Sequence, residues 1–280
     1  MKGMKLLVLL ILCGGLFFTC AQKEEINDLM TQNRDGLVYK INQAKPFTGK
    51  VIAYYENGLK RIEATYQSGK KNGAFTEWYE NGQAKFEGNF NNDLPTGLLV
   101  HWNSAGEKLY EHTFTGGLRS EPANLSDVDV AIMIDIFDMH HEIMNPTAKG
   151  FAHNYTKNND VIADDATGLM WQYDGTASDV TYDGAVRYIN ELNKKKFSGY
   201  SDWRLPTLDE VMTLMEPEPV HGDLYIDPIF DKTQRWLWTS DRVKDKPYRW
   251  IVRLAHGDCP NNGIVTNFSV RAVRTGGMEG

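Results

Sequence analysis

Cysteine is scarce in this sequence, which holds only Cys13, Cys20 and Cys259 in 280 residues. Cys13 lies within an apolar N-terminal segment and Cys20 directly follows it, so Cys259 stands alone in the rest of the chain. A lone cysteine cannot form a disulfide within the folded part. It also cannot supply a thiolate metal site of the usual paired spacing. We therefore expect a fold held together by packing, with no metal ion and no cofactor.

Basic residues are also in deficit. Lysine and arginine number 30 against 37 aspartate and glutamate residues, which gives a formal net charge of −7. Without the first 19 residues, which carry Lys2 and Lys5, 28 basic and 37 acidic side chains would give −9. A surface of this sign repels a phosphate backbone, so we expect no nucleic acid partner. The length suggests about two domains of roughly 100–200 residues each.

Long hydrophobic runs are absent. The apolar segment Leu6–Phe18 is thirteen residues long and follows the basic start MKGMK. It is shorter than the about 20 residues that span a bilayer and is typical of a secretory signal. Its end, Phe17-Phe18-Thr19-Cys20, resembles the lipobox of bacterial lipoproteins. The resemblance implies a signal peptide over residues 1–19 and a lipidated Cys20 that anchors the chain in a membrane. The alternative is a soluble secreted protein.

The residues after Cys20, Ala21-Gln22-Lys23-Glu24-Glu25, resemble the export signal that places some Gram-negative lipoproteins on the outer face of the outer membrane. We therefore expect an outer-membrane lipoprotein exposed at the cell surface, with a tether over residues 20–38. A periplasmic orientation or secretion is the alternative.

A repeat with a period of 24 residues runs from residue 47 to residue 116. The tetrapeptide YENG occurs at Tyr55–Gly58 and again at Tyr79–Gly82. Asn-Gly between alternating segments predicts a hairpin with a type I′ turn, which needs a positive φ at both central residues. The recurring positions are Gly49, Gly73 and Gly97; Gly58, Gly82 and Gly106; Tyr54, Trp78 and Trp102; Ile62, Phe86 and Tyr110; and Tyr66, Phe90 and Phe114.

Each repeat is therefore predicted to be a strand, an Asn-Gly turn, a strand and a second glycine-containing turn such as SGKKNG. YENG and the G-x-F-x-E-W-Y pattern of Gly73–Tyr79 resemble the MORN-variant repeat of bacterial toxin–antitoxin components. The resemblance implies an antiparallel β-hairpin sheet over residues 39–118 that is used for contact. We expect its aromatic residues to form the core, and a binding stripe is the alternative.

Residues 119–150 form the predicted linker. Ser126 followed by two aspartates predicts a helix start. The apolar residues on one helical face are Val128, Ile132, Ile136, Met139 and Ile143. A strand is the alternative, because apolar residues also alternate from Val128 to Ile136. His140 and His141 suggest a metal site, but adjacent histidines point in different directions on a helix, so we expect a solvated helix end.

Residues 151–276 read as an α+β domain, because aromatic strands and turns alternate with two helical stretches. The first predicted helix, Tyr182–Lys196, has one apolar face and ends in lysines. The second follows the stretch GYSDWRLPTLDE, in which Thr207 and Glu210 form a T-x-x-E capping box after Pro206. We expect Trp203 to fill the core and Arg204 to pair with buried carbonyl groups or a carboxylate.

Four motifs mark this region: DATGLMWQ at Asp165–Gln172, GYSDWRLPT at Gly199–Thr207, WTS at Trp238–Ser240 and VRAVR at Val270–Arg274. In this order they resemble the Lcl C-terminal domain family. The resemblance implies a C-type-lectin-like fold and adhesion to polymers such as sulfated glycans, and it carries over no catalytic residues. Many members have two cysteines where this chain has Ile189 and Ala272. We therefore expect the family disulfide to be absent and packing to take its place. The expected fold-forming residues are Trp171, Trp203, Arg204, Pro206, Thr207, Glu210 and Trp238.

The sequence offers few candidate binding residues. Glu216-Pro217-Glu218 resembles half of the calcium-binding signature of sugar-binding lectins, but the Trp-Asn-Asp half is missing, so we expect no calcium-dependent sugar site. Sulfated glycans require clustered basic side chains. The candidates are Arg242, Lys244, Lys246 and Arg249, in an expected exposed loop for which simple solvation is the alternative.

Three functions compete. The leading hypothesis is a non-enzymatic, lipid-anchored surface protein that binds an extracellular glycan or protein through the C-terminal domain. The second makes the repeats the working part, as an envelope interaction scaffold or an immunity-like protein. The third is an activity like that of formylglycine-generating enzymes, which share the lectin-like fold, with Cys259 near His256 and Asp258. That chemistry needs a cysteine pair and copper, so we expect no enzyme.

Overall fold

The computed structural model describes residues 24–34, 36–119, 121–148, 150–263 and 266–276. The chain is mostly β-sheet with a few helices, 42% strand and 15% helix, and several of its sheets are antiparallel. The expected signal peptide and its lipidation candidate Cys20 lie outside the described residues. Within the described ranges, no helix has the length and apolar character needed to cross a membrane.

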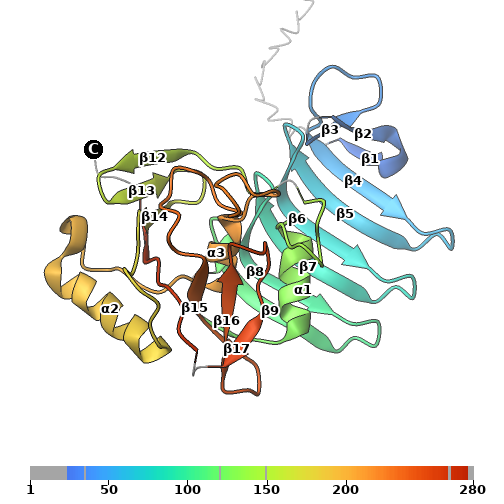
Figure 1. Cartoon of the computed structure of the whole chain (residues 1–280). Coiled ribbons are helices and arrows are strands. Elements are labelled where there is room, and N and C mark those ends of the chain that lie inside the picture. The colour runs from blue at the N-terminus through green and yellow to red at the C-terminus, as the bar shows by residue number, and fades with distance from the viewer. Residues whose placement is uncertain (1–23, 35, 120, 149, 264–265, 277–280) are drawn as a thin grey trace, which may run out of the picture.

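The repeats form one continuous sheet of eight strands in the order β1-β4-β5-β6-β7-β8-β9-β10 (Figure 1). β1 runs parallel to β4, and the strands from β4 to β10 form an antiparallel meander. The 3₁₀ turn η1 and the small hairpin β2–β3 adjoin its first edge. The bounds are β1 (Glu25–Asn27), η1 (Asp28–Met30), β2 (Thr31–Arg34), β3 (Leu37–Lys40), β4 (Gly49–Tyr54), β5 (Lys60–Gln67), β6 (Lys70–Trp78), β7 (Ala84–Asn91), β8 (Leu94–Trp102), β9 (Lys108–Thr115) and β10 (Leu118–Arg119).

The 24-residue period reappears in the hydrogen bonds that join successive hairpins. The Tyr55 hydroxyl donates to the carbonyl oxygen of Trp78 at 2.6 Å, and the Tyr79 hydroxyl donates to that of Trp102 at 2.8 Å. The side-chain amides of the two YENG asparagines likewise donate to backbone carbonyls one repeat further on, at 3.0 and 2.9 Å. The repeated tyrosine and asparagine therefore link successive hairpins through hydrogen bonds.

The type I′ turns occur at the other end of each hairpin from the one we predicted. In the YENG turns only the glycines, Gly58 and Gly82, have a positive φ, at 82° and 84°. The Gly58 N–H donates to the Tyr55 carbonyl, which fits a longer loop that ends in a left-handed glycine. Both central residues have a positive φ in the two-residue turns Ser68-Gly69, Asn92-Asp93 and Gly116-Gly117.

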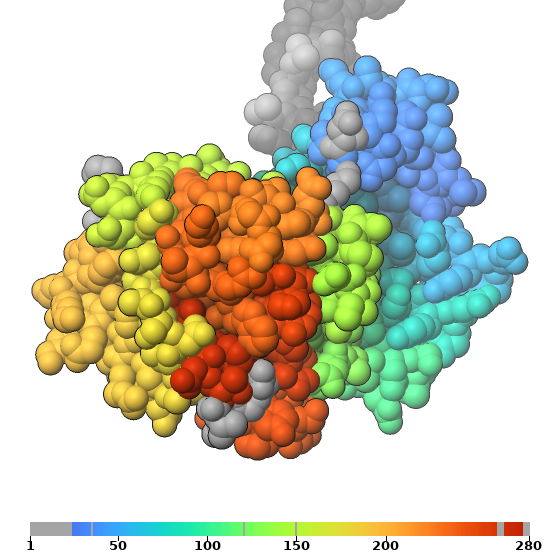
Figure 2. All heavy atoms as spheres, in the orientation of Figure 1, coloured from blue at the N-terminus to red at the C-terminus, as the bar shows by residue number. Residues whose placement is uncertain are grey.

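Helix α1 (Asp127–Ile136) lies between the repeat sheet and the C-terminal half (Figures 1 and 2). Ser126 caps it, and Asp129 completes a capping box, as the sequence predicts. The predicted apolar face is only partly correct, because the helix ends at Ile136 and Ile143 is 80% exposed. Apolar residues occur all round α1 because both of its sides are covered, which explains why its sequence also fitted a strand.

The two sides of α1 contact two different cores. Ile132 and Ile136 pack against the aromatic residues of the sheet, while Val130, Met133 and Ile134 belong to the core of the C-terminal half. The aromatic residues buried beneath α1 are Phe86, Phe90, Tyr110 and Phe114. The recurring aromatic residues that do not lie beneath α1 are more exposed to solvent, and Tyr54 is exposed. The core role that we predicted for the aromatic residues therefore depends on where α1 lies.

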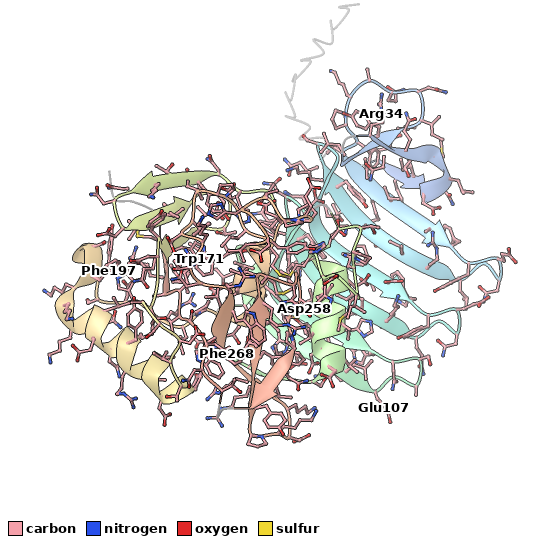
Figure 3. The ribbon with its side chains drawn as sticks, viewed as in Figure 1. Arg34, Glu107, Trp171, Phe197, Asp258 and Phe268 are labelled. Atoms are coloured by element: carbon pink, nitrogen blue, oxygen red, sulfur yellow. The ribbon has the colours of Figure 1, made fainter. Side chains whose placement is uncertain are left out.

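The C-terminal half contains two four-stranded sheets, in the orders β11-β15-β16-β17 and β12-β13-β14-β18. Two separate hydrophobic clusters fill it. One contains Trp171, which is labelled in Figure 3, and the other contains Trp203 and Trp238. The bounds are β11 (Asn124–Leu125), β12 (Tyr155–Asn158), β13 (Val161–Asp164), β14 (Leu169–Gln172), α2 (Tyr182–Lys195), η2 (Phe197–Gly199), α3 (Leu208–Thr213), β15 (Trp236–Val243), β16 (Tyr248–Arg253), β17 (Asn261–Gly263) and β18 (Val273–Thr275). The predicted helices correspond to α2 and α3.

The GYSDWRLPTLDE stretch joins α2 to α3 through buried contacts. The Trp203 side chain is buried, and its indole N–H donates to the Phe197 carbonyl at 3.1 Å. Arg204 forms a two-pronged ion pair with Glu210 at 2.6 and 2.5 Å. The Glu210 carboxylate also accepts a hydrogen bond from the Thr207 N–H at 2.8 Å. The stretch thus contributes to the scaffold, as does Trp238, whose indole N–H donates to the Val180 carbonyl.

Arg119 joins the repeat sheet to the C-terminal half through a fully buried ion network. Its guanidinium contacts the carboxylate of Asp209 and donates to both oxygens of Asp241, at 3.0 and 2.7 Å. Its backbone N–H donates to Asp209 at 2.7 Å. Burial alone would lower the pKa of Arg119, but the two carboxylates raise it above its ordinary value. The residue therefore stays charged and links β10 to α3 and β15.

The predicted solvated helix end at His140 and His141 is wrong. Both side chains are buried, and they follow α1 in a loop that docks on the C-terminal half. His140 stacks on Tyr225 with ring centroids 5.3 Å apart, and neither of its ring nitrogens has a hydrogen-bond partner among the described residues. The Nδ1 atom of His141 accepts backbone N–H groups from the next loop residues. Burial lowers the pKa of both histidines.

We predict that Arg119→Met lowers the free energy of unfolding by about 3–5 kcal/mol, because two buried carboxylates lose their guanidinium partner. Arg235→Met is the matched control, since Arg235 pairs with Asp223 on the surface, where water screens the ion pair. Urea denaturation followed by tryptophan fluorescence measures both variants. An equal loss in the two variants would contradict the importance of the buried network.

We also predict that the free energy of unfolding falls as the pH drops below about 6.5, the ordinary pKa of histidine. At that pH the unfolded chain takes up protons that the folded protein excludes from His140 and His141, so acid favours unfolding. His140→Phe keeps a ring on Tyr225 and should weaken this acid dependence, measured by denaturation between about pH 7.5 and pH 5. Identical pH profiles for the parent and His140→Phe would refute the prediction.

Candidate ligand-binding site

The β15–β16 hairpin carries all four basic residues of the predicted binding site. Asp241 and Val243 are buried, so Arg242 between them points to solvent, as alternation along a strand requires. Arg242 lies directly opposite Arg249 in the strand pairing. Lys244 and Lys246 are exposed in the turn between the two strands. The expected loop is therefore a hairpin end, with two of its basic residues on paired strands.

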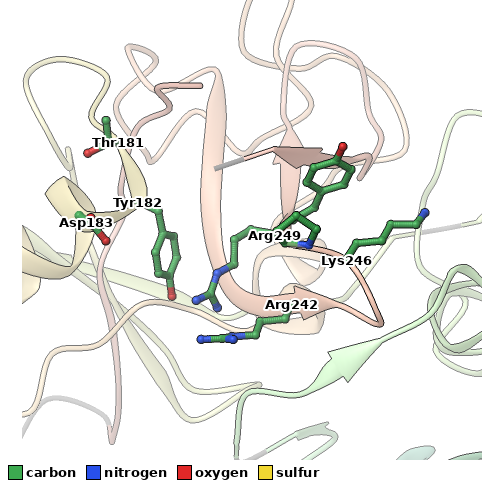
Figure 4. A pocket seen from close by; sticks show the side chains of 8 residues that line it. Thr181, Tyr182, Asp183, Arg242, Lys246 and Arg249 are labelled. Carbon is green, nitrogen blue, oxygen red and sulfur yellow. The ribbon is translucent and has the colours of Figure 1, made fainter. Parts of the chain in front are cut away.

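This hairpin borders a surface hollow of about 770 Å³, which we call the basic hollow (Figure 4). Its other wall comes from the start of α2, about sixty residues earlier in the chain. Arg242, Lys246 and Arg249 supply three cationic groups to its lining, and Asp183 is its one lining carboxylate. The lining residues are Thr181, Tyr182, Asp183, Arg242, Lys246, Pro247, Tyr248 and Arg249.

Arg249 is held against Tyr182 in this hollow. Its guanidinium carbon lies 3.8 Å from the centroid of the Tyr182 ring, and its Nη1 donates to the Ser240 carbonyl at 2.9 Å. The Tyr182 ring in turn packs edge-on against the buried Trp238 at 5.5 Å. Partial burial lowers the pKa of the Arg249 guanidinium, and the charge of Arg242 lowers it further. The core thus fixes one cation in the hollow wall.

Arg242 and Lys246 are the freer cations of the hollow. Within the described part of the chain, neither side chain has a carboxylate partner within ion-pair distance. A neighbouring hollow of about 460 Å³ shares both residues and adds Lys244 and the carboxylate of Asp245. The hairpin end therefore concentrates positive charge on a protein whose net charge is −7. Such a local concentration attracts anionic ligands.

Sequence reasoning missed the aromatic part of this hollow. It assigned Tyr182 only to the start of a helix and gave Tyr248 no role. Tyr182 and Arg249 meet because α2 and β16 pack beside the same Trp238-containing core, a contact between residues far apart in the sequence. No local pattern indicates this contact.

The residues around Cys259 do not form a nucleophilic site. The Cys259 side chain is buried, and burial raises the pKa of its thiol well above the ordinary range. Asp258 is paired with the guanidinium of Arg253, and His256 is an exposed residue beside Trp236. A thiol held in its neutral form is a poor nucleophile. The described residues also contain no group of three or more His, Cys, Asp or Glu side chains placed to hold a metal ion.

Comparison with known proteins gives information about the C-terminal half of the chain alone. No curated protein and no solved structure matches the sequence. A family model does match, over a range that contains α2, the β15–β16 hairpin and every residue that lines the basic hollow. The match agrees with the four motifs seen in the sequence. Residues 160–274 of this chain match the Lcl C-terminal domain.

Proposed function

We propose that this protein is a non-enzymatic, lipid-anchored surface protein that binds an anionic ligand, a sulfated or acidic glycan, in the basic hollow. The observation that carries the proposal is the cluster of Arg242, Lys246 and Arg249 around one hollow of about 770 Å³. These three cations stand on an acidic protein, so they are not explained by the overall charge.

The side chains that line the hollow would contribute to ligand binding in different ways. Arg249 is pre-positioned by Tyr182 and Ser240, so it loses little freedom when it donates to a sulfate or carboxylate. Arg242 and Lys246 are exposed and able to follow an irregular polymer. Tyr248 is 40% exposed beside them and offers an amphipathic ring to a sugar face. Binding should weaken with added salt, because the cations are solvent-exposed.

The matched family and the observed sheets support a C-type-lectin-like fold for residues 151–276 as part of this proposal. One complete four-stranded sheet, three strands of the other and two principal helices lie in this region. The lipid anchor at Cys20 rests on the lipobox-like end of the apolar segment. The assignment of the repeats to the MORN-variant class rests on YENG and on the 24-residue period. Together these features describe a binding domain held at a surface.

A second candidate is an interaction scaffold that works through the repeats. It is favoured by apolar side chains that the repeat sheet leaves exposed, among them Tyr54, Leu59 and Leu98. Deleting the repeats would leave Asp209 and Asp241 without Arg119, and deleting the C-terminal half would leave Arg119 without its two carboxylates. Because either deletion would disturb the half that remains, deletions would not separate the two candidates. Point substitutions in the intact chain are therefore the better test.

We predict that the Arg242→Ser/Lys246→Ser double variant of residues 21–280 binds immobilised heparin at least about tenfold more weakly, a loss of roughly 1.4 kcal/mol. The control, Lys194→Ser/Lys195→Ser, removes the same charge from the exposed end of α2. The salt concentration that elutes each protein measures the effect. Equal retention of the two variants would show that net charge rather than the hollow drives binding, and retention of neither parent nor variants would reject the glycan class.

Cys259 should be chemically inert in the folded protein. We expect a thiol-specific alkylating reagent to leave residues 21–280 unmodified under native conditions and to modify Cys259 after unfolding, because the thiol is buried and neutral. Mass spectrometry before and after addition of denaturant measures this. Rapid modification of the native protein would reopen the case for thiol chemistry.

A further inference from the structure

Three exposed apolar side chains gather at the N-terminal end of the repeat sheet. Leu29 is 83% exposed, Met30 is 46% exposed and Ile41 is 44% exposed. The Ile41 N–H donates to the Met30 carbonyl at 2.8 Å, so the 3₁₀ turn η1 and the end of β3 are joined. We call these three residues the apolar tip. Clustered exposed apolar side chains are typical of interaction surfaces.

The apolar tip is held in place by the surrounding polar contacts. The Asn27 side chain caps η1 by accepting the Leu29 N–H at 2.9 Å. The Thr31 hydroxyl donates to the Asp28 carbonyl at 2.6 Å, and the Asp28 carboxylate pairs with Arg61 of β5 at 2.8 Å. Leu29 is therefore presented to solvent by an anchored turn.

The tip lies next to the point where the described chain begins. The Glu24 carbonyl accepts the Lys50 N–H at 2.7 Å, which fixes Glu24 to β4. The Lys40 ammonium contacts the Glu24 carboxylate, and Ile41 directly follows Lys40. Three residues lie between Cys20 and Glu24, so their Cα atoms are at most about 14 Å apart. A lipid on Cys20 would thus hold the bilayer surface close to the tip.

The β2–β3 hairpin beside the tip and the loop that follows it carry basic and aromatic side chains. Arg34 and Lys45 have no carboxylate partner within the described ranges. The Arg34 guanidinium lies 3.7 Å from the centroid of the Tyr39 ring. Cationic side chains and tyrosine rings favour the headgroup layer, where their apolar parts face the acyl chains.

We propose that Leu29, Met30 and Ile41 insert into the interface of the membrane that carries the lipidated Cys20, so that the repeat sheet stands on the bilayer by this end. The inference rests on the proposed lipid anchor. In Figures 1 and 3 the N-terminal strands and Arg34 lie at the upper right, whereas the lower ends of β16 and β17 lie at the bottom. Insertion at the tip therefore directs the basic hollow away from the membrane, toward soluble ligands.

An environment-sensitive thiol probe tests the insertion on the lipidated full chain. The probe is attached to the Leu29→Cys variant, or to the control Leu98→Cys, whose parent side chain is 52% exposed on β8. Cys259 is buried and stays unlabelled. In vesicles of phosphatidylethanolamine and phosphatidylglycerol we expect a several-fold rise and a blue shift of emission at position 29, quenched by lipid-borne quenchers. Position 98, five strands from β1 and about 24 Å away across the sheet, should show neither change.

The outcomes separate this inference from the anchor on which it rests. A lipidated chain that does not float with vesicles rejects both the anchor and the insertion. A chain that floats while the probe at position 29 stays unchanged rejects the insertion alone. A concentration-dependent shift at position 29 in detergent without vesicles would mean that a second copy covers the tip, and it would also overturn the inference.

Discussion

The arrangement of the whole molecule depends on one buried guanidinium. Arg119 ends the repeat sheet and lies between Asp209 and Asp241, both fully buried in the C-terminal half. Such a network is costly to desolvate and costlier to break, since each lost partner leaves an uncompensated charge in the interior. Asp241 also accepts the backbone N–H groups of Ala123 and Leu208, both at 2.6 Å. One carboxylate therefore positions the linker, the start of α3 and strand β15.

The ion pair between Arg119 and Asp241 also helps to position the candidate binding site. Asp241 immediately precedes Arg242, so the strand that carries the first cation of the basic hollow is fixed by the junction with the repeats. On the opposite wall, Trp238 supports Tyr182 and Tyr182 supports Arg249. The hollow is thus built on rigid elements, while its free charges, on Arg242 and Lys246, project from the hairpin. A ligand site of this kind combines pre-organisation with adaptability.

Helix α1 makes the two halves one body. It is apolar on both sides because it serves two cores at once, the aromatic face of the repeat sheet and the core that contains Met133 and Ile134. The loop after it is held by the buried His140, which stacks on Tyr225. Through these contacts the repeat sheet, which carries the N-terminal apolar tip, is packed against the half that carries the basic hollow.

Local patterns in the sequence determined the helix starts, the hairpin repeat and the scaffold role of the GYSDWRLPTLDE stretch, because capping residues, a 24-residue period and alternating apolar positions act over a few neighbours. They also located the four basic residues of the hairpin. Tertiary structure alone decided that Tyr182 meets Arg249, that His140 is buried and that Arg119 pairs with Asp209 and Asp241. These contacts join residues from about 70 to 120 positions apart, and their strength comes from burial, which depends on how separate elements pack.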